Sequence, residues 1–151
     1  MAITIKSKIV VIGAGNVGEA IGYTLMLRRQ ASDIVLVDLN EKRAKGSALD
    51  IAHGTAFSRQ SRIRMGGYEE CADAEAIIIT AGVARKPGQT RLDLAKINVG
   101  IIRSITENIM RYADNPLIVV VSNPVDISTY IVQQTSGLPA NRVIGTGTSL
   151  D

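Results

Sequence analysis

A glycine-rich turn between two apolar runs constrains this chain more than any other stretch. Residues 8–12 are mostly β-branched and apolar, which predicts a buried strand. Residues 34–37 repeat that pattern and are followed by Asp38. Between these runs, residues 13–18 read Gly-Ala-Gly-Asn-Val-Gly, and apolar residues then recur at helical spacing. The order strand, glycine turn, helix, strand and acid is typical of a dinucleotide-binding unit.

Each part of this unit has a physical role. Gly13 lets the chain turn sharply away from the strand, and Gly15 lacks a Cβ, so that a pyrophosphate can approach the main chain. Gly18 lets the helix pack close to the sheet, and the N–H groups at the helix N-terminus face the phosphates. Asp38 is placed to accept hydrogen bonds from ribose hydroxyls and would repel a 2′-phosphate, which favours NAD over NADP. The alternative is a tight turn in an α/β protein that binds no nucleotide.

The composition is typical of a globular α/β protein. Its 151 residues predict one domain, residues 1–151, with 46% hydrophobic and 21% charged residues. Because only 3% are aromatic, Ile, Val, Leu and Ala must supply the core, as in strands that helices cover on both faces. The net charge is +3, and the basic cluster of Arg59, Arg62 and Arg64 is expected to be a solvated loop and strand end. We therefore predict no nucleic-acid partner.

Cysteine content and hydropathy indicate the cellular environment in which the chain is expected to fold. Cys71 is the only cysteine, which excludes an internal disulfide, and we expect a half-buried or surface thiol rather than a nucleophile. The N-terminus carries no charged-then-apolar leader, and no apolar run approaches the length of about 18 residues that a membrane span needs. The sequence thus predicts a cytoplasmic protein with no membrane partner.

Apolar runs and helical patterns alternate along the rest of the chain. We expect helices over residues 41–53, 91–112 and 125–135, and strands over residues 62–65, 76–80, 117–121 and 142–145. The inner side of the long helix should carry Leu94, Ile97, Ile101, Ile105 and Ile109. Parallel strands joined by right-handed crossovers give an α/β, doubly wound parallel sheet of the Rossmann type, with strand order 3-2-1-4-5-6. Ligands then bind beyond the carboxyl ends of the strands.

A basic loop over residues 84–90 follows one of these strand ends. Arg85 and Lys86 precede Pro87-Gly88, and Arg91 follows the loop. A hinged basic loop beside a nucleotide site has the features of a lid, because arginine binds carboxylates through paired hydrogen bonds and polarises carbonyls. A solvated surface loop is the alternative interpretation.

Other polar residues at element ends are candidates of lower specificity. Asn123 can present its amide to a substrate oxygen, and a cis Asn123–Pro124 bond would provide the sharp turn needed before the next helix. Asp126 is expected in the first turn of that helix, where the dipole stabilises an acid. His53, the only histidine, is expected at the C-terminus of helix 41–53. We therefore predict no histidine placed for acid/base chemistry and no metal site.

Several further segments give the chain a resemblance to one family. They are residues 10–15 (VVIGAG), 48–54 (ALDIAHG), 80–82 (TAG), 85–94 (RKPGQTRLDL), 122–126 (SNPVD) and 142–151 (RVIGTGTSLD). Together they resemble the NAD-dependent L-lactate/L-malate dehydrogenases over the whole chain, and the L-lactate dehydrogenase branch is the most similar.

The resemblance implies roles for the matching residues. Gly13, Gly15, Val17 and Gly18 would hold the pyrophosphate, and Asp38 would bind the adenosine ribose. Arg43 would lie near the adenosine end. Further cofactor contacts are implied for Tyr68, Gly82, Val83, Ser104, Ser122, Asn123 and Thr146.

The resemblance also implies a reaction. Arg91 matches the lid arginine that polarises the substrate carbonyl, and Asn123 matches a substrate-contacting amide. Asp151 matches the carboxylate that orients the catalytic histidine and stabilises its imidazolium form. The implied enzyme transfers hydride between NAD(H) and a small L-2-hydroxy acid or 2-oxo acid.

Two departures from the family pattern bear on this prediction. Arg85 stands where typical lactate dehydrogenases carry Gln, and arginine there is the usual mark of malate dehydrogenases, because it can pair with a second carboxylate. Whole-chain similarity favours L-lactate/pyruvate as the substrate pair, with L-malate/oxaloacetate as the alternative. The family's substrate-carboxylate arginine, catalytic histidine and second, catalytic domain are not among these 151 residues. We therefore expect this chain to bind NADH without turnover, and the full-length enzyme to form a dimer or tetramer.

Two other function classes remain open from the residues alone. One is a nucleotide-binding module without chemistry of its own, which the absent histidine and second domain favour. The other is a different Rossmann protein such as a methyltransferase, in which the arginines of residues 85–91 would have no role.

Overall fold

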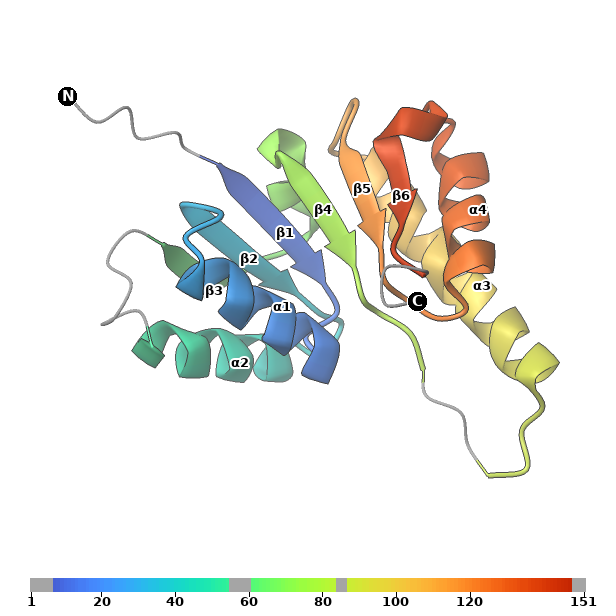
Figure 1. Cartoon of the computed structure of the whole chain (residues 1–151), viewed down its shortest axis with the longest axis horizontal. Helices are drawn as coiled ribbons and strands as arrows, with labels where there is room; N and C mark the ends of the chain where they lie inside the picture. The colour runs from blue at the N-terminus through green and yellow to red at the C-terminus, as the bar shows by residue number, and fades with distance from the viewer. Residues whose placement is uncertain (1–6, 55–60, 84–86, 148–151) are drawn as a thin grey trace.

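A central parallel sheet has helices on both faces (Figure 1). The computed structural model describes residues 7–54, 61–83 and 87–147, with only the main chain of Arg91. Within these ranges the strands are β1 (Lys8–Ile12), β2 (Asp33–Val37), β3 (Arg62–Met65), β4 (Ala76–Ile79), β5 (Leu117–Val120) and β6 (Val143–Gly145). Their order is β3-β2-β1-β4-β5-β6 with parallel neighbours, which confirms the predicted doubly wound sheet.

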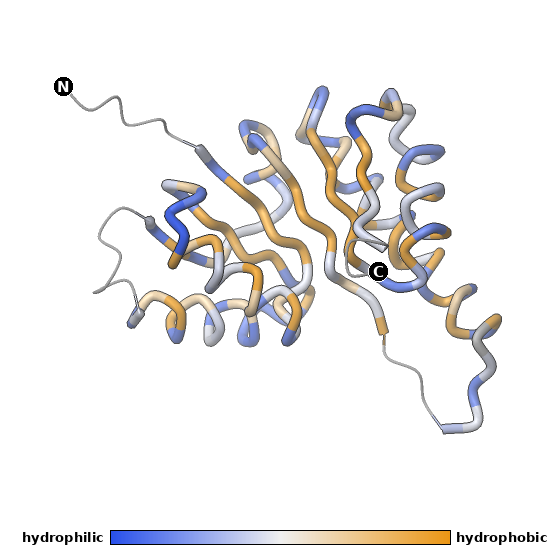
Figure 2. The backbone as a smooth tube through the Cα atoms, viewed as in Figure 1, coloured by the Kyte–Doolittle hydropathy of each residue, from blue (hydrophilic) through white to orange (hydrophobic). Residues whose placement is uncertain are grey.

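Strand alternation divides the core into two apolar layers. Val11 belongs to the layer under α1 (Asn16–Leu27) and α2 (Glu41–His53). Val10 and Ile12 belong to the layer under α3 (Arg91–Met110), to which α4 (Val125–Ser136) also contributes. Figure 2 shows the resulting apolar colour along the strands, which helices cover on both sides. No helix in the described part of the chain is long and apolar enough to cross a membrane.

The helix ends follow their sequence signals. Thr90 caps α3, because its hydroxyl accepts the Asp93 N–H at 3.1 Å while the Asp93 carboxylate accepts the Thr90 N–H at 3.2 Å. This capping lowers the pKa of Asp93. At the other end of the chain, α4 stops at Gly137, whose φ of 68° is the left-handed conformation that favours glycine.

The inner face of α3 is partly different from the predicted one. Ile97 is 44% exposed, whereas Ile102, which was not on the predicted face, is fully buried. The buried positions are Asn98, Ile102, Ile105, Thr106 and Ile109. The apolar pattern predicted the wrong face because the buried face of α3 includes a polar residue, Asn98, that packs inward.

Two 3₁₀-helices, η2 (Tyr68–Asp73) and η3 (Ala140–Arg142), were not predicted. Arg142 therefore precedes β6 instead of starting it. Because η2 packs its middle turn on the sheet, Cys71 is 1% exposed, so the expectation of a half-buried or surface thiol was wrong. Burial raises the pKa of this thiol to about 12.

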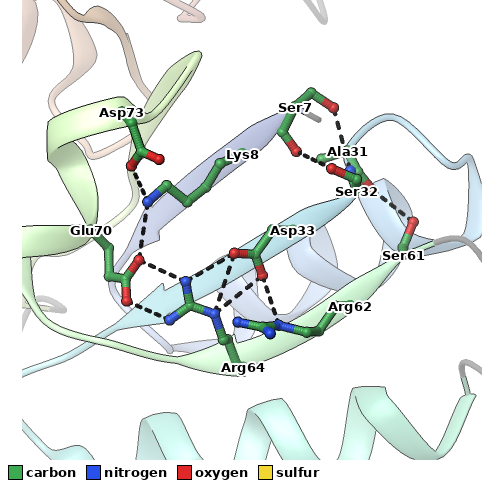
Figure 3. A network of polar contacts seen from close by, with 10 residues as sticks. All are labelled: Ser7, Lys8, Ala31, Ser32, Asp33, Ser61, Arg62, Arg64, Glu70 and Asp73. Carbon is green, nitrogen blue, oxygen red and sulfur yellow. Dashed lines mark hydrogen bonds and ion pairs between the residues drawn. The ribbon is translucent and has the colours of Figure 1, made fainter. Parts of the chain in front are cut away.

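Ion pairs connect η2 to the amino end of the sheet (Figure 3). The Arg64 guanidinium lies 2.9 Å from the Asp33 carboxylate and 2.6 Å from the Glu70 carboxylate. Lys8 pairs with Glu70 at 3.1 Å and also with Asp73. Hydrogen bonds from Arg64 lower the pKa of Glu70 to about 2. Arg64 is thus paired with carboxylates at the end of the sheet opposite to the predicted ligand site.

Candidate functional site

A cleft of about 530 Å³ opens at the carboxyl ends of β1, β2 and β4. The loops after these three strands form one side of it, and η2 and α3 form the other. It brings together eight of the predicted cofactor residues: Gly13, Gly15, Asp38, Arg43, Tyr68, Gly82, Val83 and Ser104. Doubly wound sheets bind their ligands at this position.

Gly13 and Gly18 have steric reasons within the fold to be glycine. Gly13 has a φ of 109°, and a Cβ there would lie 2.7 Å from both the Thr80 hydroxyl and the Ala81 nitrogen. A Cβ on Gly18 would lie 1.8 Å from the Gly13 carbonyl oxygen. The chain can therefore turn off β1 and enter α1 in this small space only with both glycines.

Gly15 is different, because the fold itself leaves room for a side chain there. Its φ of −81° and ψ of −177° are extended backbone, which any residue adopts. Among the described residues, a Cβ would meet only the Arg43 guanidinium, at 3.6 Å. Gly15 precedes α1, whose ladder starts with the bond from the Glu19 N–H to the Gly15 carbonyl at 2.8 Å. Open space beside a helix N-terminus and a guanidinium fits a diphosphate.

Asp38 is fixed at the end of β2 by main-chain donors. Its Oδ2 accepts the Ala14 N–H at 2.7 Å, and its Oδ1 accepts the Asn40 N–H at 2.8 Å. An ionised carboxylate offers about four lone-pair positions, so both oxygens can accept further hydrogen bonds. The half-buried carboxylate lines the cleft and can bind a pair of ribose hydroxyls.

The α3 side of the cleft contains several residues that the sequence reasoning did not select: Gly100, Ile101, Ile105 and Asn108. All lie three or four positions from Ser104 or from one another, so helical spacing around Ser104 could have identified them. Tyr68 of η2 lies on the same side of the cleft and is half-buried, and burial raises its phenol pKa. Apolar side chains with a few polar groups suit a flat heteroaromatic ring.

Five predicted cofactor residues do not line the cleft: Val17, Gly18, Ser122, Asn123 and Thr146. Val17 is 53% exposed and lies on a separate groove along α1. Ser122 is buried, and its hydroxyl donates to the Ala81 carbonyl at 2.7 Å. The exposed Asn123 follows β5, and Thr146 follows β6, where its N–H donates to the Val120 carbonyl at 3.1 Å.

The predicted substrate residues are described only in part. Arg85 and Asp151 lie outside the described residues, and Arg91 is the first residue of α3. The Asn123–Pro124 bond is cis, as the required turn suggested. Asp126 lies in the first turn of α4, and His53 is the last residue of α2, both as expected.

Asn98 is a buried polar residue that the sequence analysis did not single out. It is 2% exposed and contacts the loops after both β4 and β5. Its Oδ1 accepts the Val83 N–H at 3.0 Å, and its Nδ2 donates to the Asn123 carbonyl at 3.1 Å. Nothing in the local sequence distinguishes this asparagine from a solvated helical residue.

The glycine turn, the acid after β2 and the cleft between them define a dinucleotide-binding domain of the Rossmann class. Residues 7–145 match the family described as lactate/malate dehydrogenase, NAD binding domain. This match covers most of the chain, and the chain therefore belongs to that family. Its cofactor is NAD, as the glycine turn and Asp38 predicted.

Individual relatives agree with this assignment. The L-lactate dehydrogenase of Halalkalibacterium halodurans is 49% identical over 152 aligned positions, which cover 100% of this chain and 49% of that protein. The minor L-lactate dehydrogenase from Enterococcus mundtii, in its ligands-bound form, is similar with a TM-score of 0.90 and 47% identity, over 96% of this chain and 46% of that one. The malate dehydrogenase from Archaeoglobus fulgidus in complex with NADH is similar with a TM-score of 0.86 and 44% identity, over 91% of this chain and 48% of that one. The chain spans about half the length of the curated relatives it matches.

Proposed function

We propose that this domain binds NAD(H) in the cleft, with the diphosphate against Gly15 and the N-terminus of α1. The observation that carries the proposal is the space beside Gly15, where no contact with the described residues requires a glycine. Asp38 would bind the adenosine ribose, and its negative charge would disfavour the 2′-phosphate of NADP(H). Arg43, whose guanidinium lies beside Gly15, would add a positive charge near the phosphates.

Calorimetric titration tests the proposal. We expect NADH to bind with one site per chain, NADPH to bind at least about tenfold more weakly, and S-adenosylmethionine to give no heat of binding. Equal affinity for NADH and NADPH would contradict the role of Asp38. A chain that binds S-adenosylmethionine instead would belong to the methyltransferase alternative.

We further propose that the enzyme carrying this domain is an oxidoreductase acting on L-lactate and pyruvate. Bound NAD would accept the hydride when L-lactate is oxidised, and bound NADH would donate it when pyruvate is reduced. Arg91 would polarise the substrate carbonyl, Asn123 would contact the substrate, and Asp151 would orient a histidine outside these 151 residues. The support comes from relatives named L-lactate dehydrogenase, which are 45% to 49% identical to this chain.

L-Malate and oxaloacetate are the second candidate pair, favoured by one residue. Arg85 could pair with the second carboxylate of oxaloacetate, which pyruvate lacks. Structures named malate dehydrogenase are 40% and 44% identical to the chain. Steady-state rates of the full-length enzyme with pyruvate and with oxaloacetate decide between the pairs, and a strong oxaloacetate preference would overturn the lactate proposal. We expect no turnover of either substrate by the 151-residue chain.

Assembly and location remain predictions. A dimer or tetramer of the full-length enzyme can be tested by analytical ultracentrifugation. A cytoplasmic location can be tested by fractionation of the source cells.

A further inference from the structure

Asn98 is a residue of α3 that contacts the loops following β4 and β5. Its amide is almost completely buried and lies beside Gly82, where a Cβ would be 3.5 Å from the asparagine oxygen. The Val83 N–H can only donate and the Asn123 carbonyl can only accept, so these two partners fix the orientation of the amide. One side chain thus holds main-chain groups of two different loops.

A second contact connects the same two loops. The Ser122 hydroxyl donates to the Ala81 carbonyl at 2.7 Å, and Ser122 and Ala81 are the neighbours of Asn123 and Gly82. The hydroxyl joins the loops directly, whereas Asn98 joins them through α3. Together the two contacts set the separation of the loops beyond β4 and β5.

The loops after β4 and β5 lie on the side of the cleft toward which a bound dinucleotide would extend. Asp38 and Arg43 lie at one end of the cleft, and Gly15 lies between that end and β4. A dinucleotide with its adenosine on Asp38 and its diphosphate on Gly15 must extend its other half across the sheet. That half would lie over Val83, which lines the cleft, and toward the end of β5, which Asn123 follows.

We propose that Asn98 is a positioning residue for the nicotinamide half of the site, because it holds the main chain of Val83 and Asn123 at a fixed separation. The inference rests on the proposed binding of NAD(H). It predicts a selective effect, since the adenosine half of the cofactor, placed on Asp38, would contact neither of the two main-chain groups that Asn98 holds.

The test compares NADH with ADP-ribose, which lacks the nicotinamide. Asn98→Asp has nearly the same shape and keeps an acceptor for the Val83 N–H, but it places an oxygen against the Asn123 carbonyl. We expect the variant to bind NADH at least about tenfold more weakly and ADP-ribose within about twofold of wild type. Asn98→Ala, which buries no charge and removes both hydrogen bonds, should show the same selective loss.

Thr106→Val is the matched control. Thr106 is fully buried on the same helix, but its hydroxyl donates to Ile102 within α3, at 2.8 Å. We expect this variant to have a changed melting temperature and unchanged affinity for both ligands. The binding stoichiometry for ADP-ribose measures the folded fraction of every variant.

The outcomes separate the inference from the proposed function. If wild type binds neither ligand, the proposed function fails. If wild type binds NADH no more tightly than ADP-ribose, the domain does not hold the nicotinamide, and the inference fails alone. The inference also fails if both Asn98 variants lose the two ligands equally, lose neither, or do not fold, because Asn98 would then serve only the fold.

Discussion

Replacing Gly15 with alanine should weaken cofactor binding by about a hundredfold or more, with little effect on the fold. The main chain at Gly15 is extended, and in the part of the chain that the structure describes the added Cβ would have only the Arg43 guanidinium within 4 Å, at 3.6 Å. Alanine is a poorer N-cap than glycine, which costs up to about 1 kcal/mol. Alanine also has less conformational freedom than glycine in the unfolded chain. This difference stabilises the fold by about 0.4–1 kcal/mol and so offsets part of the capping cost. The free energy of unfolding should therefore change by less than about 1 kcal/mol.

The loss of binding should be much larger. The methyl group would occupy the space where a diphosphate approaches the N–H groups at the start of α1. Displacing the phosphates weakens at least two hydrogen bonds to a charged group, each with a contribution of about 1.5–3 kcal/mol. A total loss of about 3 kcal/mol or more corresponds to an affinity decrease of about a hundredfold.

Calorimetry with NADH and thermal unfolding of the same samples measure both quantities. Gly46→Ala is the matched control, because Gly46 is exposed in α2 and a Cβ there meets no atom of the described residues within 4 Å. It should stabilise the helix by about 1 kcal/mol and leave the NADH affinity unchanged. A Gly15→Ala variant that binds NADH like wild type would refute the placement of the diphosphate.

Three further predictions concern single side chains. Asp38→Ser removes the charge that would repel a 2′-phosphate, so the affinity ratio of NADH to NADPH in calorimetry should fall toward one, and an unchanged ratio would contradict the role of Asp38. The pKa of Glu70 is about 2 in the fold, below its ordinary value near 4.5, so its ion pair with Arg64 stabilises the fold above pH 4.5 and is lost as the pH falls toward 2. The melting temperature of wild type should consequently decrease over that range more than that of Glu70→Gln, and parallel curves would refute this linkage. Burial raises the pKa of Cys71 to about 12, so a maleimide should label the thiol at neutral pH only after denaturant is added, and rapid labelling of the native chain would show that this part of the core opens.

Elements with strong local signals were predictable from the sequence. The predicted helix over residues 41–53 has the observed bounds, because Asn40 caps it and Gly54 follows it. The inner strands β1, β2, β4 and β5 were predictable because helices cover both faces of the sheet, so each is a mostly apolar run. The edge strand β3 was predictable from the alternation of apolar residues with Arg62 and Arg64. Strand order followed from the alternation of strands and helices together with the handedness of crossovers.

Elements that depend on tertiary contacts were not predictable in the same way. The 3₁₀-helix η2 has three acidic residues and no helical apolar pattern, and it is held by its packing on the sheet and by ion pairs to Arg64 and Lys8. The burial of Cys71 depends on that packing. An apolar pattern predicts Ile97 buried and Asn98 exposed, but the structure shows the reverse. Hydropathy alone cannot predict this, because a buried amide becomes favourable only through hydrogen-bond partners from other parts of the chain.

The candidate site shows the same division. Gly13, Gly18 and Asp38 were predictable because one motif specifies both the turn and the ligand contacts. The α3 side of the cleft was mostly missed because its residues become neighbours of the glycine turn only when η2 and α3 pack on the same face of the sheet.

Asp38 connects the glycine turn to the candidate ligand site. Its carboxylate accepts the N–H of Ala14, the residue between the first two glycines of the turn. The main chain that would face a diphosphate is therefore held by the group that would bind the ribose. A preorganised site loses less conformational entropy on binding. The affinity should therefore depend on the ribose contact and the diphosphate contact together rather than on either one alone. For this reason a substitution at Asp38 should weaken the diphosphate contact as well as the ribose contact, whereas Gly15→Ala should leave the carboxylate in place.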